Sequence, residues 1–294
     1  MIFPGNQGQF VLSKQLGKGA YGIVYLSHLK TNPEKLYAIK VMDRSKIKGK
    51  AQELLINEIG IMADLKHRNV CKLVSATKTE SNYYLVTEFC NGGDLSGFMK
   101  ARGGYLEELE ARLLLRQLVR GMAAIQRENI MHRDLKLPNI LLHFPELTRD
   151  QICSEQFSIQ SFTSEVEITG EHAVKVVVKI ADLGFARRLA PDDLAKTTCG
   201  TPLNMAPEVL EGHEYDLTAD VWSLGCVFYE MLTGFSPFTG TNQRNLKHNL
   251  AKGSYQFPKT LRLSLLGLDF INQCLQYDSS KRPTLQQLLD HPYF

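Results

Sequence analysis

The stretch from His132 to Asn139 constrains this chain more than any other part of the sequence. It packs an acid, two cations and an amide together, directly before the apolar run Ile140 to Leu142. Because unpaired charges are costly to bury, a polar cluster between two core-forming segments is unlikely to be a core element. We interpret it as a loop that its flanks hold rigidly, so that Asp134, Lys136 and Asn139 converge on one point. For any single residue, a charged loop at a helix end is the alternative.

A glycine-rich segment near the N-terminus is the second signal. The spacing of Gly17, Gly19 and Gly22 lets backbone amides approach phosphate groups closely. Dinucleotide-binding folds use the same spacing, but they need a helix after the glycines. Here the β-branched and aromatic residues Ile23 to Tyr25 continue as strand. We therefore predict a glycine-rich hairpin that covers a nucleotide, with Val24 facing the base.

A lysine lies in the next apolar strand, which runs from Leu36 to Met42. Lys40 is either a solvated strand residue or a lysine that grips the α- and β-phosphates of a nucleotide. The second interpretation needs a glutamate on a following helix, and apolar residues at helical spacing predict that helix from Gln52 to Leu65. Glu58 lies on it, so we predict an ion pair between Lys40 and Glu58.

The pattern changes from strand to helix near the glycine pair 92–93, which predicts an α+β fold of two lobes, residues 1–90 and 91–294. The crossing segment offers backbone groups to an adenine edge, and Asp94 can reach a ribose. Residues 143–172 form a long polar insertion, which is functional or mobile and is expected to add little to the core. The alternation of Val166 and Ile168 predicts a strand there, paired with the segment Val174 to Ile180.

Composition limits the classes of partner and compartment. A net charge of +3 is too small to argue for nucleic acid or lipid as a partner. We find no signal peptide at the N-terminus and no apolar run as long as a membrane span. The six cysteines lack metal-ligand or disulfide-framework spacing, so reduced thiols are the default. We therefore expect a soluble cytoplasmic protein without a transmembrane segment.

These motifs occur in the order found in eukaryotic protein kinases, completed by Asp182-Leu183-Gly184 and Ala206-Pro207-Glu208. The chain resembles that family from Phe10 to Phe294. The resemblance implies a bilobal α+β fold, with a small β-rich lobe that carries one key helix, a larger helical lobe, and ATP and Mg²⁺ in the cleft. It also implies that Thr201 lies near Asp134, that Asp220 braces the catalytic loop, and that Arg282 pairs with Glu208.

The resemblance assigns chemical roles to the matched residues, as phosphoryl transfer requires. Asp134 would orient the acceptor hydroxyl and Lys136 would neutralise the transferring group. Asn139 and Asp182 would hold Mg²⁺. Lys40, positioned by Glu58, would anchor the phosphates. The implied nucleotide contacts are Leu16, Gly17, Gly19, Gly22, Val24, Ala38, Lys40, Thr87, Glu88, Cys90, Asp94, Leu141 and Asp182.

A closer resemblance concerns substrate class and pathway. Lys136 looks like the serine/threonine class, which implies serine and threonine side chains of proteins as acceptors. The segments Glu88 to Leu95 and Lys179 to Arg187 resemble the Unc-51-like kinases, which initiate autophagy. Leu183 replaces the usual Phe and keeps an apolar residue there. A regulatory tail usual in that family is missing after Phe294 or was removed, so regulatory partners acting through it are implied.

Thr197 is the predicted activating phosphosite, because it lies in a polar stretch between Asp182 and Glu208. Arg133 and Arg187 are the cations expected to receive the phosphate. Arg133 could instead pair with the neighbouring acid. Two other functions are less consistent with the sequence: a pseudokinase scaffold would have lost a catalytic residue, and residues 206–208 disfavour a small-molecule kinase.

Overall fold

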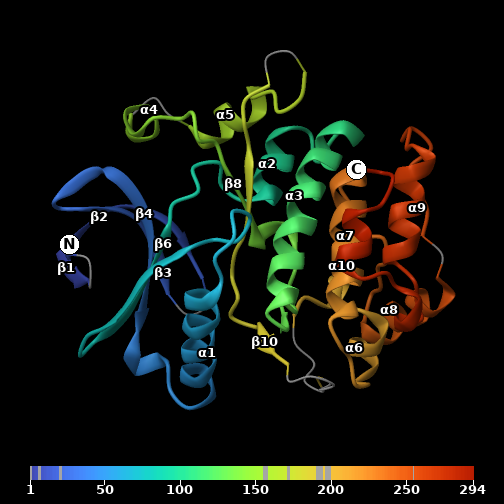
Figure 1. The fold of residues 1–294 in the computed structure, drawn as a ribbon, viewed down its shortest axis with the longest axis horizontal. Helices are drawn as coiled ribbons and strands as arrows, with labels where there is room; N and C mark the ends of the chain where they lie inside the picture. Colours follow the sequence, from blue (N-terminus) through green and yellow to red (C-terminus); the bar gives the residue numbers. More distant parts are fainter. Residues whose placement is uncertain are drawn as a thin grey trace.

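The computed structural model describes residues 2–5, 8–19, 22–154, 158–170, 173–189, 195, 200–253 and 255–294. A β-sheet built by the first part of the chain lies beside a mainly helical region built by the rest (Figure 1). The α+β class and the bilobal kinase-like architecture are therefore confirmed. No helix within the described residues is both long and apolar enough to cross a membrane.

The sheet has six strands in the order β1-β2-β3-β4-β6-β5, and every neighbouring pair is antiparallel. The predicted glycine-rich hairpin is confirmed, because the strands on either side of its turn pair with each other. The strand at the N-terminal edge was not predicted. The strands are β1 (Ile2–Gly5), β2 (Gly8–Lys18), β3 (Ile23–Leu29), β4 (Asn32–Asp43), β5 (Leu73–Lys78) and β6 (Asn82–Glu88).

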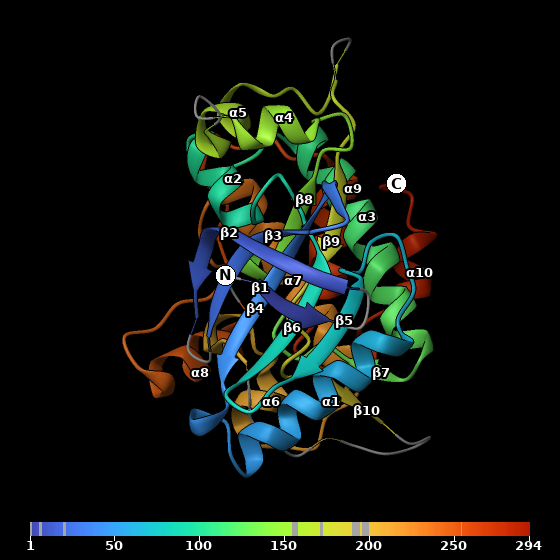
Figure 2. The same cartoon turned by 90° about the vertical axis from the view of Figure 1, so that its left-hand side faces the viewer.

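One helix packs against this sheet, as predicted, and it crosses below the strands in Figure 2. The short helix η1 (Arg44–Lys46) leads into α1 (Lys50–Asp64). Leu55, Ile61 and Met62 are buried on the inner face of α1, which is the apolar face that the sequence period indicates. Glu58 lies on the same buried face and thus points inward.

The helical region is built around α3 and α7. The almost fully buried helix α7 carries Trp222, which stacks on Phe238 at 5.3 Å between ring centroids. Thr284 caps α10, and its side chain and that of Gln287 form a capping box. The helices are α2 (Leu95–Ala101), α3 (Glu108–Arg127), η3 (Pro202–Asn204), α6 (Pro207–Glu211), α7 (Thr218–Thr233), α8 (Gln243–Lys252), α9 (Leu265–Cys274), η4 (Ser279–Lys281) and α10 (Leu285–Leu289).

Two short strand pairs flank the polar loop identified in the sequence. Strand β7 (Ile130–Met131) precedes the loop and pairs with β10 (Arg187–Arg188). The loop ends in η2 (Leu137–Asn139), and β8 (Ile140–His143) pairs with β9 (Val177–Ile180). Ile130, Met131, Ile140 and Ile180 are fully buried, so apolar packing holds the loop from both sides.

The insertion differs from its predicted structure. It contains α4 (Arg149–Cys153) and α5 (Ile159–Glu165), and no strand forms at its described residues Val166 and Ile168. Both of these residues are buried, as is Phe144, which packs edge-to-face on Phe162 at 5.0 Å. The expectation of a small core contribution is therefore wrong, because a few apolar residues anchor an otherwise polar segment against α2. The two helices lie at the top of Figures 1 and 2.

Candidate active site

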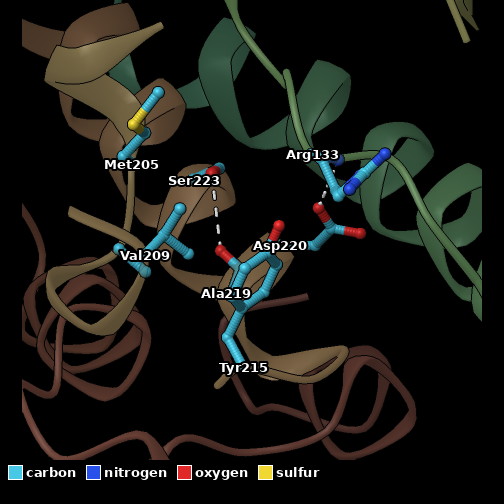
Figure 3. Close-up of a pocket in the computed structure, with 8 residues that line it drawn as sticks. Arg133, Met205, Val209, Tyr215, Ala219, Asp220 and Ser223 are labelled. Atoms are coloured by element: carbon cyan, nitrogen blue, oxygen red, sulfur yellow. Dashed lines mark hydrogen bonds between the residues drawn. The ribbon is translucent and has the colours of Figure 1, made fainter. Parts of the chain in front are cut away.

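The loop from His132 to Asn139 is braced by Asp220 of α7, as predicted. The buried Asp220 carboxylate accepts hydrogen bonds from the backbone N–H groups of His132 (2.8 Å) and Arg133 (2.9 Å). Burial raises the pKa of Asp220, while the neighbouring His132 and these N–H donors act to lower it. Figure 3 shows Arg133 beside Asp220, at the edge of a small pocket that α7 lines. The backbone of the loop is thus held from the α7 side.

A glycine brings a second segment against this loop. Gly200 has φ +106°, and a Cβ added to it would lie 2.3 Å from the carbonyl oxygen of Arg133. Only glycine combines that backbone angle with so close an approach. Arg133 itself has φ +67°, a conformation that is costly for a residue with a side chain. The close approach places Thr201, the next residue, beside the loop.

Three side chains surround the carboxylate of Asp134. The hydroxyl of Thr201 donates to Asp134 Oδ1 (2.8 Å), which confirms the predicted proximity. Lys136 Nζ forms an ion pair with Asp134 Oδ2 (2.7 Å) and donates to Thr201 Oγ1 (3.0 Å). Asn139 Nδ2 donates to the carbonyl oxygen of Asp134 (2.9 Å) and to its Oδ2 (3.2 Å). The carboxylate is therefore oriented by a neutral hydroxyl, an amide and one cation.

Asp182 lies at the end of β9, in the left-handed region with φ +59°. A Cβ added to Gly184 would lie 3.2 Å from Asp182 Oδ1 and 3.6 Å from Glu58 Oε2, so the glycine leaves room beside both acids. Among the described residues, Asp182 is in no ion pair. Asn139 uses its amide nitrogen for Asp134, so its oxygen is the atom left for a ligand. One carboxylate and one amide oxygen fit Mg²⁺, which usually takes few protein ligands and keeps phosphates or water.

The predicted ion pair between Lys40 and Glu58 is not formed in the described part of the chain, since neither residue is in an ion pair there. Glu58 is 6% exposed, and burial raises its pKa. Lys40 acts to lower that pKa and Asp182 acts to raise it, so all three charges influence one another. Burial and the second acid both favour the neutral form of the Glu58 carboxyl group. The predicted ion pair is therefore absent from the described residues of this structure.

Strand register places the predicted nucleotide contacts on one face of the sheet. Val24 of β3 lies opposite Lys40 of β4, and Ala38 lies opposite Thr87 of β6. Directly opposed residues project to the same side, and alternate residues share a face. Gly17 extends this face, because it pairs with Val24 across the glycine-rich hairpin. Tyr37 and Ile39, on the other face, are buried in an apolar cluster that also contains Phe10, Leu29, Tyr84 and Val86.

The connection after β6 carries the remaining predicted contacts. Asp94 forms an isolated bridge with Leu141 of β8, so these two predicted contacts lie together. The Asp94 carboxylate also caps α2 by accepting from Gly97 N (2.9 Å), a role that the sequence analysis missed. The Cys90 thiol is buried; its hydrogen bond with the Cys71 thiol, together with burial, raises its pKa well above the usual value.

Lys179 is a structural residue that the sequence analysis missed. Its ammonium group lies 2.8 Å from each carboxylate oxygen of Glu88, and the backbone N–H of Lys72 donates to the same carboxylate (2.7 Å). The Glu88 N–H also donates to the carbonyl oxygen of Lys72 (3.0 Å), so the Glu88 carbonyl group is the part suited to the predicted nucleotide contact. Lys179 lies between apolar residues in β9, and a lysine in such a strand is rarely buried without an acidic partner. This pattern in the sequence could have indicated the ion pair.

A cavity of about 380 Å³ lies where these elements meet. Its polar wall comes from the catalytic loop, β4, α1 and the segment after β9. Its apolar wall comes from β4, from Ile47 after η1 and from α1. The residues are Gly19, Lys40, Met42, Ile47, Ala51, Leu54, Leu55, Glu58, Asp134, Lys136, Asp182, Gly184 and Phe185. The site thus combines a cleft of this volume, cations for phosphate groups and acids for a metal ion.

The predicted phosphosite, Thr197, lies outside the described residues. Of its expected partners, Arg133 donates from Nε to the carbonyl oxygen of Phe185 (2.6 Å). Arg133 forms no ion pair with Asp134 in the described part of the chain.

Two expectations from the resemblance concern residues outside the phosphate-binding region. Leu183 is buried, which matches its expected apolar role. The predicted pair of Arg282 and Glu208 is confirmed, with Nη1–Oε1 at 2.6 Å and Nη2–Oε2 at 2.8 Å.

Comparisons with known proteins agree with this geometry. Residues 10–294 match the family described as protein kinase domain. The chain is 33% identical to serine/threonine-protein kinase ATG1c of Arabidopsis thaliana, over 97% of this chain and 35% of that protein. It is 32% identical to calcium/calmodulin-dependent protein kinase type 1 of Macrobrachium nipponense, over 99% of this chain and 76% of that protein. It is 34% identical to serine/threonine-protein kinase PLK4 of Danio rerio, over 95% of this chain and 26% of that protein.

Proposed function

Because this chain belongs to the protein kinase domain family, we propose that it transfers the γ-phosphoryl group of ATP to serine and threonine hydroxyls of proteins. The observation that carries the proposal is the hydrogen-bonded set around Asp134, which lies in the wall of the same cavity as Lys40 and Asp182. A carboxylate that accepts a bond from the Thr201 hydroxyl is placed to accept one from a substrate hydroxyl.

In the proposed reaction Asp134 orients the acceptor hydroxyl and receives its proton. Lys136, already held by Asp134 and Thr201, lies where it can neutralise charge on the transferring group. Lys40 holds the α- and β-phosphates. Catalysis on this scheme comes mainly from positioning and from preorganised charge.

Asn139 and Asp182 are the residues proposed to hold Mg²⁺, since their oxygen atoms suit that ion. When bound, the metal would supply positive charge to the phosphates of ATP. The proposed nucleotide contacts are those on the shared sheet face and on the connection after β6. Leu141 and Asp94 would contact the nucleotide from the side opposite the sheet.

The test compares the wild-type chain with Asp134→Asn and Lys40→Met in phosphorylation of a peptide library with radiolabelled ATP. Asp134→Asn should abolish transfer while nucleotide affinity stays nearly unchanged, because other groups hold the nucleotide. Lys40→Met should lower turnover by roughly 10²–10³, the scale of one lost preorganised contact. Turnover of Asp134→Asn within a few-fold of wild type would refute the assignment.

A finer proposal concerns pathway and regulation. The chain spans 35%, 42% and 36% of the lengths of three Arabidopsis thaliana ATG1 kinases, so the activity and partners of a whole protein are proposals. We propose a role in autophagy initiation from the Unc-51-like motifs, and a cytoplasmic location from the cysteine spacing. Phosphate on Thr197 is proposed to activate the enzyme. Mass spectrometry of active protein tests that site, and phosphate on Thr198 alone would exclude it.

A further inference from the structure

One face of α3 carries four arginines that form no ion pair with any carboxylate of the described residues. Arg112, Arg116 and Arg120 are four residues apart, and Arg127 follows seven residues later. At about 100° of rotation per residue, all four project within a sector of roughly 80°. All four are exposed, and within the described part of the chain none is in an ion pair. We call these four residues the α3 arginine stripe.

The segment after α1 adds positive charge to the stripe. Asn69 Nδ2 donates to Gln117 Oε1 (3.2 Å) in the middle of α3, so residues 66–69 lie along this helix. Lys66 and Arg68 in this segment are exposed. Burial lowers the pKa of His67, and the positive charges of Arg127, Lys179 and Arg120 lower it further. The positive charge of this segment therefore comes from Lys66 and Arg68.

Two nearby acids, Glu108 and Asp64, are bonded to other residues. Glu108, one turn before Arg112, accepts hydrogen bonds from the backbone N–H (2.9 Å) and the hydroxyl (2.6 Å) of Ser264. Asp64, at the end of α1, is in an ion pair with Arg188 (2.8 Å). Like charges four residues apart also destabilise a helix, so the stripe weakens α3 in the isolated chain.

We propose that the α3 arginine stripe binds an extended acidic segment of a protein partner. The spacing supports this class of ligand. Four residues of α-helix rise about 6 Å, and alternate residues on one side of an extended chain lie roughly 6.6–6.8 Å apart. Acidic residues at every second position of an extended segment therefore match Arg112, Arg116 and Arg120, and Arg127 extends the positive charge beyond them. The stripe is one helix wide, which suits a polypeptide better than the flat surface of a bilayer.

The experiment measures binding to the complete chain by fluorescence anisotropy, and it does not depend on catalysis. One labelled peptide alternates Glu and Ser, and a second has the same composition with all Glu residues in one block. The alternating peptide should bind more tightly, and added salt should weaken its binding. The double variant Arg116→Gln/Arg120→Gln should raise its Kd on the order of tenfold, from two exposed charge pairs. Arg112 is left in place because its guanidinium lies over the Tyr293 ring, 5.8 Å from the centroid.

Two further variants separate the proposal from non-specific effects. Arg116→Lys/Arg120→Lys keeps the charge and should retain most of the binding. Arg244→Gln/Lys252→Gln removes two exposed cations from α8 and should leave the Kd unchanged. Equal affinity of the wild type and Arg116→Gln/Arg120→Gln for the alternating peptide would overturn the proposal.

Two other ligands serve as competing outcomes. A single-stranded RNA oligonucleotide or phosphatidylserine vesicles that bound more tightly than the peptide, and lost that binding in Arg116→Gln/Arg120→Gln, would overturn the assignment to a protein partner. Circular dichroism and the melting temperature confirm that each variant is folded. Failure of the phosphorylation assay would leave this binding result unaffected, because α3 lies apart from the proposed catalytic residues.

Discussion

Loss of the buried Arg282 guanidinium should destabilise the helical region strongly, because this group bonds one carboxylate and several backbone carbonyls. The Arg282 side chain is fully buried, and that of Glu208 is 13% exposed. Besides its two bonds to Glu208, the guanidinium donates to three backbone carbonyl oxygens, those of Gln276 (2.8 Å), Thr218 (3.3 Å) and Tyr277 (3.2 Å). Arg282→Met would leave a nearly buried carboxylate and three carbonyl groups without this partner.

The magnitude follows from these contacts. Removing one partner of a buried ion pair costs about 3–5 kcal/mol, because the other charge stays buried. Glu208→Gln should cost less, about 1–3 kcal/mol, since the amide oxygen still accepts a hydrogen bond and Arg282 keeps its three carbonyls. Urea unfolding at pH 7 measures both losses, from the midpoint and the slope. The adjacent Lys281 is the control, because its side chain is 70% exposed and Lys281→Met should change stability by less than about 0.5 kcal/mol. A loss below about 1 kcal/mol for Arg282→Met, or one smaller than that of Glu208→Gln, would refute this reasoning.

Three other predictions test the site and the insertion. Thr201→Val removes the hydroxyl that bonds both the acid and the lysine of the catalytic loop, and single-turnover assays should show transfer slowed about 10²-fold, with ATP affinity unchanged. The raised pKa of Glu58 means that its contribution to stability is present below its unfolded pKa and is lost as pH rises through the folded value. The urea midpoint of the wild type should therefore fall as the pH rises above about 4, and Glu58→Gln should make this fall smaller. The same pH dependence of the midpoint in both proteins would contradict the burial argument. Gly92→Ala should cost about 1–3 kcal/mol, because its Cβ would lie 2.6 Å from the Phe144 ring, whereas Gly60→Ala in open space on α1 should stabilise the protein by about 0.5–1 kcal/mol in the same measurement.

The sequence by itself determined the elements whose signals are local. The β-branched residues after Gly22 decide that the glycine-rich segment continues as a strand, and the structure forms that hairpin. Thr284 and Gln287 form a capping box within one turn, so the start of α10 is readable from four residues. The order of the motifs indicated the family, because each motif keeps its chemistry in a short segment.

Tertiary structure alone decided the features that depend on residues far apart in the chain. The polar composition of the insertion hid the burial of Phe144, Val166 and Ile168, because burial depends on the surface that α2 offers and not on local composition. The distance between Lys40 and Glu58 depends on the position of α1 against the sheet, which their spacing in sequence does not specify. The arginines of α3 repeat visibly in the sequence, but only the packed structure decides that their face stays exposed and that the nearby acids Glu108 and Asp64 are bonded elsewhere. A charge has a partner or lacks one according to which distant groups the folded chain brings within a few ångströms of it.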